Sequence, residues 1–355
     1  MKVGILTFHW ATNYGAVLQC CALQNFLETL GNEVQVINYK PKQYDDNIYT
    51  FLRLLKFKNL TKYINEKKKE KALEIFRTKY ISRTRRFYSY KDLNPFVSQF
   101  EAIISGSDQV ANPSFLLSGE GEGIVSPTYF LGFPFYGLRI GYALSFGCVS
   151  YPKKACNIAA NYIKKFNIVT VREKTGIDIL KSMGRDDAKV VPDPTILMPS
   201  EFYQDLADKS KKTCNSYIYS FFIRYINDRK VAINKMLNKN NILWNNDDND
   251  YSMEGWLGKI KHAEFVITDS FHCVVMCLKF HVPFVVITEK EGNVGMNDRL
   301  YTLLRKCGLI KCILHKSLIG NIINVLAMNV KWEEVDSALS EYCNEGKSIL
   351  ERYLK

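Results

Sequence analysis

The sequence predicts an α/β protein with two parallel-sheet domains that face each other across a cleft. Short apolar runs alternate with helical patterns along the chain, and the alternation starts a second time near residue 200. The chain has 355 residues, more than one ordinary hydrophobic core accommodates. We therefore expect an N-terminal domain at 1–197, a C-terminal domain at 198–330, and a C-terminal helix at 331–355, for which packing back on the N-terminal domain is one possibility.

The first half opens with an apolar strand at 2–8 and a helix at 14–30, which ends before Gly31 because glycine commonly follows the last helical turn. A basic helical insert at 45–91 comes after the second strand. The other elements of this half are a strand at 33–39, a strand at 100–108, a Gly- and Pro-rich loop at 115–136, a strand at 139–146, a strand and helix within 166–183, and a closing segment at 188–197.

The second half repeats the alternation. Its predicted elements are a strand at 216–223, a helix at 226–237, a strand at 241–246, a helix at 252–263, a strand at 264–270, a helix at 271–280 and a strand at 282–288. The long pattern at 331–354 is that of an amphipathic helix.

The composition is that of a soluble globular protein, with 47% hydrophobic and 24% charged residues. The first ten residues read as a strand and lack the features of a secretion signal, and no uncharged apolar stretch reaches the length of a membrane span. We therefore expect a cytoplasmic protein. The ten cysteines show no C-x-x-C pair and no paired His/Cys cluster, so we interpret them as buried thiols and expect no metal site.

The net charge of +12 is concentrated in the basic insert. Between Phe51 and Lys91 there are fourteen Lys or Arg against three Glu, with apolar residues at roughly helical spacing. This pattern suits an anionic membrane surface and, equally, a helical pair with one solvated basic face. A diphosphate is a further option. Nucleic acid ranks last and is not expected as a partner, because no recognised nucleic-acid-binding module accompanies the charge.

A polar cluster follows the apolar strand at 264–270. Ser270 is placed to cap the helix that begins at Phe271, and the N-terminus of such a helix attracts anions. His272 falls in the first turn of this helix, close to Asp269. A lone histidine is usually a satisfied core residue, but this combination of aspartate, cap serine and histidine favours a functional site.

Similar polar turns follow other strands. They contain Asn13, Tyr14 and Gly15, then Ser105, Ser107 and Asp108, then Arg172 and Glu173, and finally Arg299 at a helix start. Each is weak alone, but open α/β sheets bind ligands at the carboxyl ends of their strands, so the recurrence is informative. Asp193 lies between two prolines, and we interpret it as part of a rigid hinge between the domains.

Taken in order, six segments resemble the polysaccharide pyruvyl transferase family. They are GILTFHWATNYGAVLQ, ISGSDQVANP, YALSFG, VREKTG, VPDPTIL and VITDSFHCVVMCLKFHVPFVVI, and the resemblance extends from residue 4 to about 308. It implies a GT-B-like pair of Rossmann-like domains. It also implies an enzyme that takes pyruvate from phosphoenolpyruvate and installs it as a cyclic ketal on a hexose, often galactose, of a surface polysaccharide such as a capsule.

That chemistry assigns roles to the polar turns. Phosphoenolpyruvate carries a carboxylate and a phosphate, which suit Arg172 and Arg299. His272 fits a general acid that protonates the enol ether carbon, and Asp108 or Asp269 would orient it or accept the hydroxyl proton. The further donor-binding candidates are Ser270, Asn13, Tyr14, Gly15 and Ser107. The scheme needs no metal and no cofactor, because phosphoenolpyruvate is a co-substrate.

The resemblance further implies an acceptor that is lipid-diphosphate-linked or polymeric, at the inner membrane face, where Arg53–Lys91 would bind the anionic surface. Two positions depart from the family pattern, with Ala111 in place of the usual Trp and Cys273 in place of the usual Gly. These departures leave two alternatives open. One is a GT-B nucleotide-sugar glycosyltransferase, since a fold does not define a function, and the other is a non-catalytic sugar-binding homologue.

Overall fold

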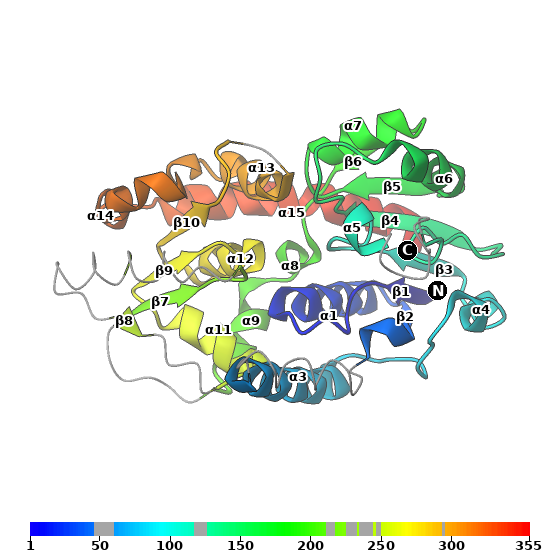
Figure 1. Ribbon diagram of the computed structural model, residues 1–355, viewed down its shortest axis with the longest axis horizontal. Helices are drawn as coiled ribbons and strands as arrows, with labels where there is room; N and C mark the ends of the chain where they lie inside the picture. Colours follow the sequence, from blue (N-terminus) through cyan, green and yellow to red (C-terminus); the bar gives the residue numbers. More distant parts are fainter. Residues whose placement is uncertain are drawn as a thin grey trace. The chain divides into compact units, whose positions relative to one another are not determined.

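The computed structural model describes residues 1–45, 60–116, 126–210, 217–224, 233, 244–245, 250–292 and 295–355. The chain divides into two compact units, each built on one parallel sheet (Figure 1). Unit 1 comprises Met1–Leu197 together with Cys343–Lys355, and unit 2 comprises Met198–Tyr342. The predicted α/β class with two parallel sheets is confirmed. Among the helices described here, none is long and apolar enough to cross a membrane.

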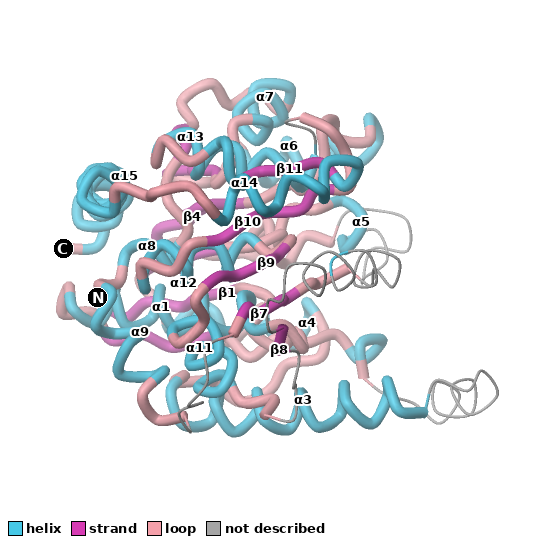
Figure 2. Tube along the Cα trace, turned by 90° about the vertical axis from the view of Figure 1, so that its left-hand side faces the viewer, coloured by secondary structure: helices cyan, strands magenta, loops and turns pink. Residues whose placement is uncertain are grey.

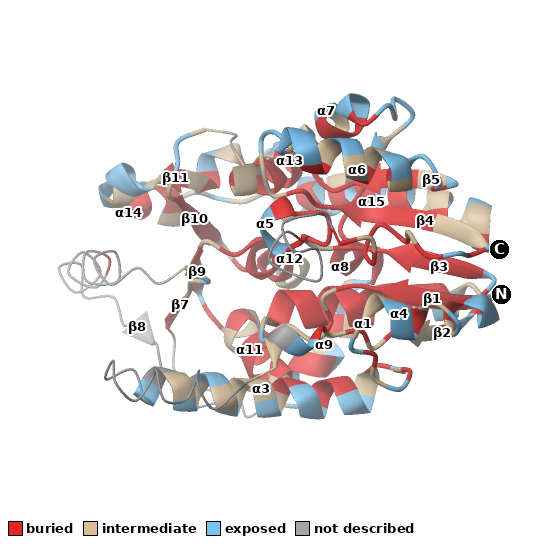
Figure 3. Cartoon of the chain, turned by 45° about the vertical axis from the view of Figure 1, so that its right-hand side comes forward, coloured by how far each residue is buried: buried red, intermediate tan, exposed pale blue. Residues whose placement is uncertain are grey.

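Unit 1 contains a six-stranded sheet in the order β2-β1-β3-β4-β5-β6, with every neighbouring pair parallel. The strands are β1 (Lys2–Leu6), β2 (Glu33–Val36), β3 (Ala102–Ser105), β4 (Leu138–Leu144), β5 (Ile168–Val171) and β6 (Lys189–Val190). The central strands are almost wholly buried (Figure 3), as expected of parallel strands covered on both faces. Their carboxyl ends all lie at one edge of the sheet.

Helix α1 (Tyr14–Thr29) shows how the connections of unit 1 begin and end. The side-chain oxygen of Asn13 accepts hydrogen bonds from the N–H groups of Gly15 and Ala16, at 2.9 and 3.3 Å. The chain leaves the helix through Gly31, whose φ of 83° favours glycine. The other helical segments are η1 (Lys42–Tyr44), α3 (Leu60–Tyr80), α4 (Tyr90–Leu93), η2 (Val97–Gln99), α5 (Pro113–Leu116), α6 (Lys153–Ile163), α7 (Thr175–Ser182) and α8 (Pro194–Leu197).

Unit 2 contains a five-stranded parallel sheet in the order β11-β10-β9-β7-β8 (Figure 2). The strands are β7 (Ile218–Phe221), β8 (Trp244–Asn245), β9 (Phe265–Thr268), β10 (Phe284–Thr288) and β11 (Ile313–His315). Its helical segments are α9 (Ser200–Ala207), α11 (Met253–Lys261), α12 (Phe271–Phe280), η3 (Gly295–Asn297), α13 (Asp298–Lys306), η4 (Ile310–Cys312), η5 (Lys316–Asn321) and α14 (Ile322–Leu326).

The predicted strands are confirmed where the structure describes them, with ends that shift by a few residues. The strand predicted at 100–108 ends at Ser105, because Gly106 and Asp108 adopt positive φ angles that turn the chain out of the sheet. The sequence pattern missed α6, α9, β11 and α14. The helix predicted at 226–237 and the first part of the basic insert, 46–59, lie outside the described residues apart from residue 233.

The C-terminal helix α15 (Trp332–Leu354) starts in unit 2, and its last turns belong to unit 1 (Figure 1). Gly346 lies against unit 1 at a point that admits no side chain. A Cβ there would meet the hydroxyl of Tyr142 and would lie 2.7 Å from Cγ of Pro192. Close packing at this glycine therefore fixes the end of α15 on unit 1.

We expect Gly346→Leu to lower the free energy of unfolding by about 1–3 kcal/mol, because overpacking displaces the neighbouring side chains. Urea denaturation measures the change. Gly320→Leu is the matched control, since a Cβ at Gly320 would meet nothing within 4 Å. Equal losses in the two variants would contradict the docking of α15.

Candidate active site

A buried arginine after β5 gathers three carboxylates at the carboxyl edge of the unit 1 sheet. Arg172 is 2% exposed. Its Nη1 donates to Asp193 at 2.8 Å and its Nη2 donates to Asp108 at 3.3 Å. Its Nε lies 3.8 Å from the carboxylate of Glu173. One guanidinium against three carboxylates leaves this cluster with a net negative charge.

The carboxylates keep Arg172 charged. Burial lowers the pKa of Arg172, but Asp193, Asp108 and Glu173 together outweigh burial and raise the pKa above its usual value. The guanidinium therefore already has anionic partners from the protein itself. The predicted contact of Arg172 with the donor stays a prediction, and the observed geometry favours a role in holding its neighbours.

Asp193 anchors this cluster from the end of β6. It is fully buried, and its Oδ1 accepts hydrogen bonds from the N–H and the hydroxyl of Thr195, at 3.0 and 2.7 Å. Its Oδ2 accepts from Arg172 and from the Ser107 hydroxyl, which is 3.1 Å away. The sequence suggested Asp193 as part of a hinge. In the structure its side chain is bonded to the carboxyl edge of the unit 1 sheet, four positions before the first segment of unit 1 ends at Leu197.

Asp108 is the member of the cluster that reaches solvent. Its side chain is 14% exposed, against 2% for Arg172 and 0% for Asp193. Its φ of 67° lies in the left-handed region, which aspartate tolerates better than most residues. The backbone of Ser107 is held alongside, because its N–H donates to Gln19 at 3.1 Å. This geometry presents one carboxylate at the strand edge.

The loop between β1 and α1 is held by an arginine from α3. Arg77 is 1% exposed, and it donates to the carbonyl oxygens of His9 and Ala11 at 2.8 and 3.0 Å. Thr12 in the same loop donates to Glu70 of α3 at 2.6 Å. The C-terminal part of the basic insert is therefore structural, which the sequence did not reveal.

The predicted residues of this loop have local contacts. The side-chain oxygen of Asn13 is engaged in the α1 cap, and Gly15 is one of the N–H donors to it. Tyr14 is 6% exposed, and the ammonium of Lys69 lies 4.2 Å from the centre of its ring. These contacts account for Asn13, Tyr14 and Gly15 as a helix start, and their predicted binding of the donor stays a prediction.

In unit 2, the predicted cap at the end of β9 is confirmed. The Ser270 hydroxyl accepts a hydrogen bond from the N–H of Cys273 at 3.4 Å, and α12 begins at Phe271. His272 is 4% exposed in the first turn, with its ring 5.3 Å from that of Phe271. The helix therefore begins directly after β9, so its N-terminus, the positive end of the helix dipole, lies at the carboxyl edge of the unit 2 sheet.

Two further predicted residues lie around this turn. The oxygens of Asp269 accept hydrogen bonds from the backbone N–H groups of Ile223 and Arg224, at 2.7 and 3.2 Å, which ties the end of β9 to the end of β7. Arg299, in the first turn of α13, is 7% exposed, and its guanidinium lies 5.7 Å from the centre of the Phe271 ring. The structure thus brings His272 and Arg299 to the same phenylalanine.

The predicted site residues fall into one group in each unit. Unit 1 holds Asn13, Tyr14, Gly15, Ser107, Asp108 and Arg172, and unit 2 holds Asp269, Ser270, His272 and Arg299. The sequence reasoning missed the roles of Asp193, Glu70 and Arg77. The last two had a readable signal, because Glu70 and Arg77 are seven positions apart and therefore share one side of a helix.

The two departures from the family pattern are both buried. Ala111 is 1% exposed and Cys273 is 0% exposed. Burial raises the pKa of the neighbouring Cys277 thiol well above its usual value, and Cys273 raises it further. Cys273 therefore sits in an apolar core environment, which makes it a packing residue next to His272.

The comparisons with known proteins identify the family. The model of the polysaccharide pyruvyl transferase family matches residues 13–291. The chain belongs to the polysaccharide pyruvyl transferase family. No curated protein matches the sequence.

Solved structures of low sequence identity resemble the fold of this pyruvyl transferase family member. A protein described as a UDP-N-acetylglucosamine 2-epimerase from Listeria monocytogenes matches with a TM-score of 0.52 and 10% identity, over 96% of this chain and 90% of that one. The UDP-GlcNAc 2-epimerase from Neisseria meningitidis has a TM-score of 0.49 and 9% identity, over 97% and 100%. Spinosyn forosaminyltransferase SpnP has a TM-score of 0.46 and 10% identity, over 98% and 95%. The likeness with a TM-score of 0.52 concerns the fold alone, and it agrees with the predicted two-domain α/β architecture.

Residue His9 gives a prediction of pH dependence. Burial lowers the pKa of His9 from the ordinary 6.5 to about 4, and its hydrogen bonds to Asn38 and Thr7 only partly offset this. Between pH 6.5 and pH 4, His9 is protonated in the unfolded chain but stays neutral in the folded protein. Stability is therefore complete above pH 6.5 and falls as the pH drops towards 4. The expected loss between pH 7 and 4.5 is about 2–3 kcal/mol.

Urea unfolding at pH 7 and pH 4.5 tests this for the parent and for His9→Asn. The variant should lose less stability on acidification than the parent. His281→Asn is the control, because the His281 side chain is 45% exposed. If His9→Asn and the parent show the same acid sensitivity, His9 does not carry the effect.

Proposed function

We propose that this protein transfers pyruvate from phosphoenolpyruvate to a hexose, most simply galactose, of a surface-polysaccharide precursor, and that the product is a cyclic ketal. The family match over residues 13–291 is the observation that carries the proposal. The capped turn with His272 supports it, because a ketal transferase needs a proton donor beside an anion-binding group.

The donor anion is assigned to the group in unit 2. Arg299 and the N-terminal turn of α12 offer a guanidinium and the positive end of a helix dipole, which suit the carboxylate and the phosphate of phosphoenolpyruvate. Arg172 is assigned to a positioning role instead, because three carboxylates already surround it. This assignment refines the sequence-based proposal, which gave both arginines to the donor.

The reaction then proceeds by proton transfer and addition. His272 gives a proton to the methylene carbon of phosphoenolpyruvate, which leaves oxocarbenium character at the neighbouring carbon. One sugar hydroxyl adds to that carbon, the bond to phosphate breaks, and a second hydroxyl closes the ring. Of the two hydroxyl protons, one restores His272 and the other leaves with phosphate. As in the sequence-based proposal, Asp108 or Asp269 accepts a hydroxyl proton on its way to phosphate, and Asp269 already receives two backbone N–H groups.

The proposal includes the place of action. The acceptor is a saccharide on a lipid diphosphate or a growing polymer, and the enzyme meets it in the cytoplasm at the inner face of the membrane. The support for this step is the cluster of basic residues between Arg53 and Lys91.

The test is a donor assay. The protein is incubated with phosphoenolpyruvate or nucleotide sugars and a panel of free and lipid-linked galactosides, and the products are followed by phosphate release and mass spectrometry. Phosphate release with the mass of a pyruvyl ketal is expected. Release of nucleotide from nucleotide sugars, with phosphoenolpyruvate inert, would instead support a glycosyltransferase. Binding of the sugar without turnover of any donor would support a non-catalytic protein.

The variant His272→Ala tests the general acid. Its turnover of phosphoenolpyruvate should fall roughly 10²–10⁴-fold, the usual contribution of such a group. His281→Asn, at the other end of α12, is the control and should keep the parent rate, since asparagine tolerates the left-handed φ of 55° at that position. An unchanged rate in His272→Ala would assign that histidine to structure alone.

A further inference from the structure

Helix α3 has one face inside unit 1 and another outside it. Leu73, Phe76 and Arg77 are buried, with exposures of 0%, 1% and 1%. On the other side, Ile64 is 43% exposed and Ile75 is 61% exposed. Two large apolar side chains are thus exposed on the same side of one helix. Burying them against a partner would be favourable, which indicates an interaction surface.

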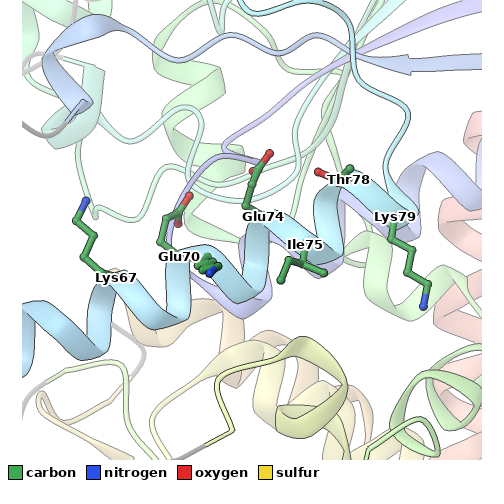
Figure 4. Close-up of a pocket in the computed structure, with 7 residues that line it drawn as sticks. Lys67, Glu70, Glu74, Ile75, Thr78 and Lys79 are labelled. Atoms are coloured by element: carbon green, nitrogen blue, oxygen red, sulfur yellow. The ribbon is translucent and has the colours of Figure 1, made fainter.

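Lysines surround these isoleucines. We define the outward face of α3 as Ile64, Lys68, Lys71, Ile75 and Lys79. Successive members along it are three or four positions apart, which places them on one side of a helix. Figure 4 shows Ile75 and Lys79 on the opposite side of the helix from Glu74.

Two of the three glutamates of α3, Glu70 and Glu74, have cationic partners of their own, and Glu66 lies two positions from Ile64, on the opposite side of the helix. Glu70 and Glu74 accept hydrogen bonds from Arg77 at 2.9 and 3.0 Å, and Glu74 also pairs with Arg83 at 2.7 Å. The two arginines thus balance the two acids at the side of the helix. The lysines of the outward face give the exposed surface its positive charge.

The other arginines in the described part of the basic insert are also engaged within unit 1. Arg86 pairs with Asp45 at 2.6 Å, and the guanidinium of Arg85 lies 4.5 Å from the centre of the Phe87 ring. In the described part of the insert, the arginines therefore hold the fold, whereas Lys68, Lys71 and Lys79 of α3 are exposed on the outward face.

The outward face also borders a shallow hollow. All seven residues that line the hollow come from α3: Lys67, Lys71, Lys79, Ile75, Thr78, and the glutamates Glu70 and Glu74, whose charges Arg77 and Arg83 balance (Figure 4). A hollow lined by one helix, with ammonium groups around an exposed isoleucine, suits a flat anionic partner better than an enclosed small molecule.

We propose that the outward face of α3 docks this protein on an anionic lipid surface. The lysines attract lipid phosphates, and Ile64 and Ile75 enter the boundary between headgroups and acyl chains. We choose this partner because the ammonium groups of the outward face complement the negative charge of lipid phosphates. The proposal rests on the part of the proposed function that places the acceptor at a membrane, and it names the surface that meets that membrane.

Vesicle sedimentation with the full chain tests the proposal. The probes are vesicles of phosphatidylcholine with about one third phosphatidylglycerol, and vesicles of phosphatidylcholine alone, with neither donor nor acceptor sugar present. We expect binding to the anionic vesicles only. The binding should weaken as salt rises from low to physiological concentration, because salt screens exposed charges.

Two variants locate the surface. Lys68→Ser with Lys71→Ser should weaken binding to anionic vesicles roughly 25-fold, about fivefold per lysine. Ile75→Ser should weaken it as well. The matched controls are Lys153→Ser with Lys154→Ser, two exposed lysines of α6, and Val149→Ser, which is 60% exposed against 61% for Ile75. All four changes are at exposed positions, so the variants should unfold at the temperature of the parent.

Three results would overturn the proposal. The first is equal binding to both kinds of vesicle, or none. The second is an equal loss in the α6 controls. The third is a dimer in solution that Ile75→Ser dissociates, which would make the outward face a contact between copies of this chain. Ketal formation on a free galactoside is measured separately, so a failure there rejects the enzymatic function without touching the vesicle result.

Discussion

The ion cluster around Arg172 is the interaction on which the carboxyl edge of unit 1 depends. A buried guanidinium is tolerated only with close partners of opposite charge, and Arg172 has Asp193 at 2.8 Å and Asp108 at 3.3 Å. Glu173 continues the cluster, since its Oε1 accepts from the Ser145 hydroxyl at 2.8 Å. The ends of β3, β4, β5 and β6 are thus bonded to one another through side chains. Asp108 gains a fixed position from this cluster.

Unit 2 joins the carboxyl ends of its strands in a different way from unit 1. In unit 2, Asp269 joins the ends of β7 and β9 through backbone N–H groups, and Ser270 starts α12 so that His272 lies in its first turn. Here backbone N–H groups satisfy the aspartate, whereas a buried guanidinium does so in unit 1. The guanidinium of Arg299 lies near the ring of Phe271 in the same part of unit 2.

Much of this follows from the sequence, because local patterns determine it. The buried parallel strands read as apolar runs, and the cap at Ser270 depends on residues three positions apart. The role of Asp193 could not be read in this way, since its bonds to Arg172 and Ser107 join residues 21 and 86 positions apart. The same holds for Arg77, which reaches back 68 positions to His9. In the basic insert, composition showed the charge, but only the fold separates the arginines that brace a loop from the lysines that face outward.

The most direct test of this account is a double-mutant cycle on the Arg172–Asp193 pair, with the free energy of unfolding measured in urea. Arg172→Met alone should cost about 3–5 kcal/mol, because it leaves buried carboxylates without their cation. Adding Asp193→Leu should recover part of that loss, with a coupling energy of about 1–3 kcal/mol. Additive losses, or an Arg172→Met variant as stable as the parent, would show that the ion cluster does not hold the strand ends together.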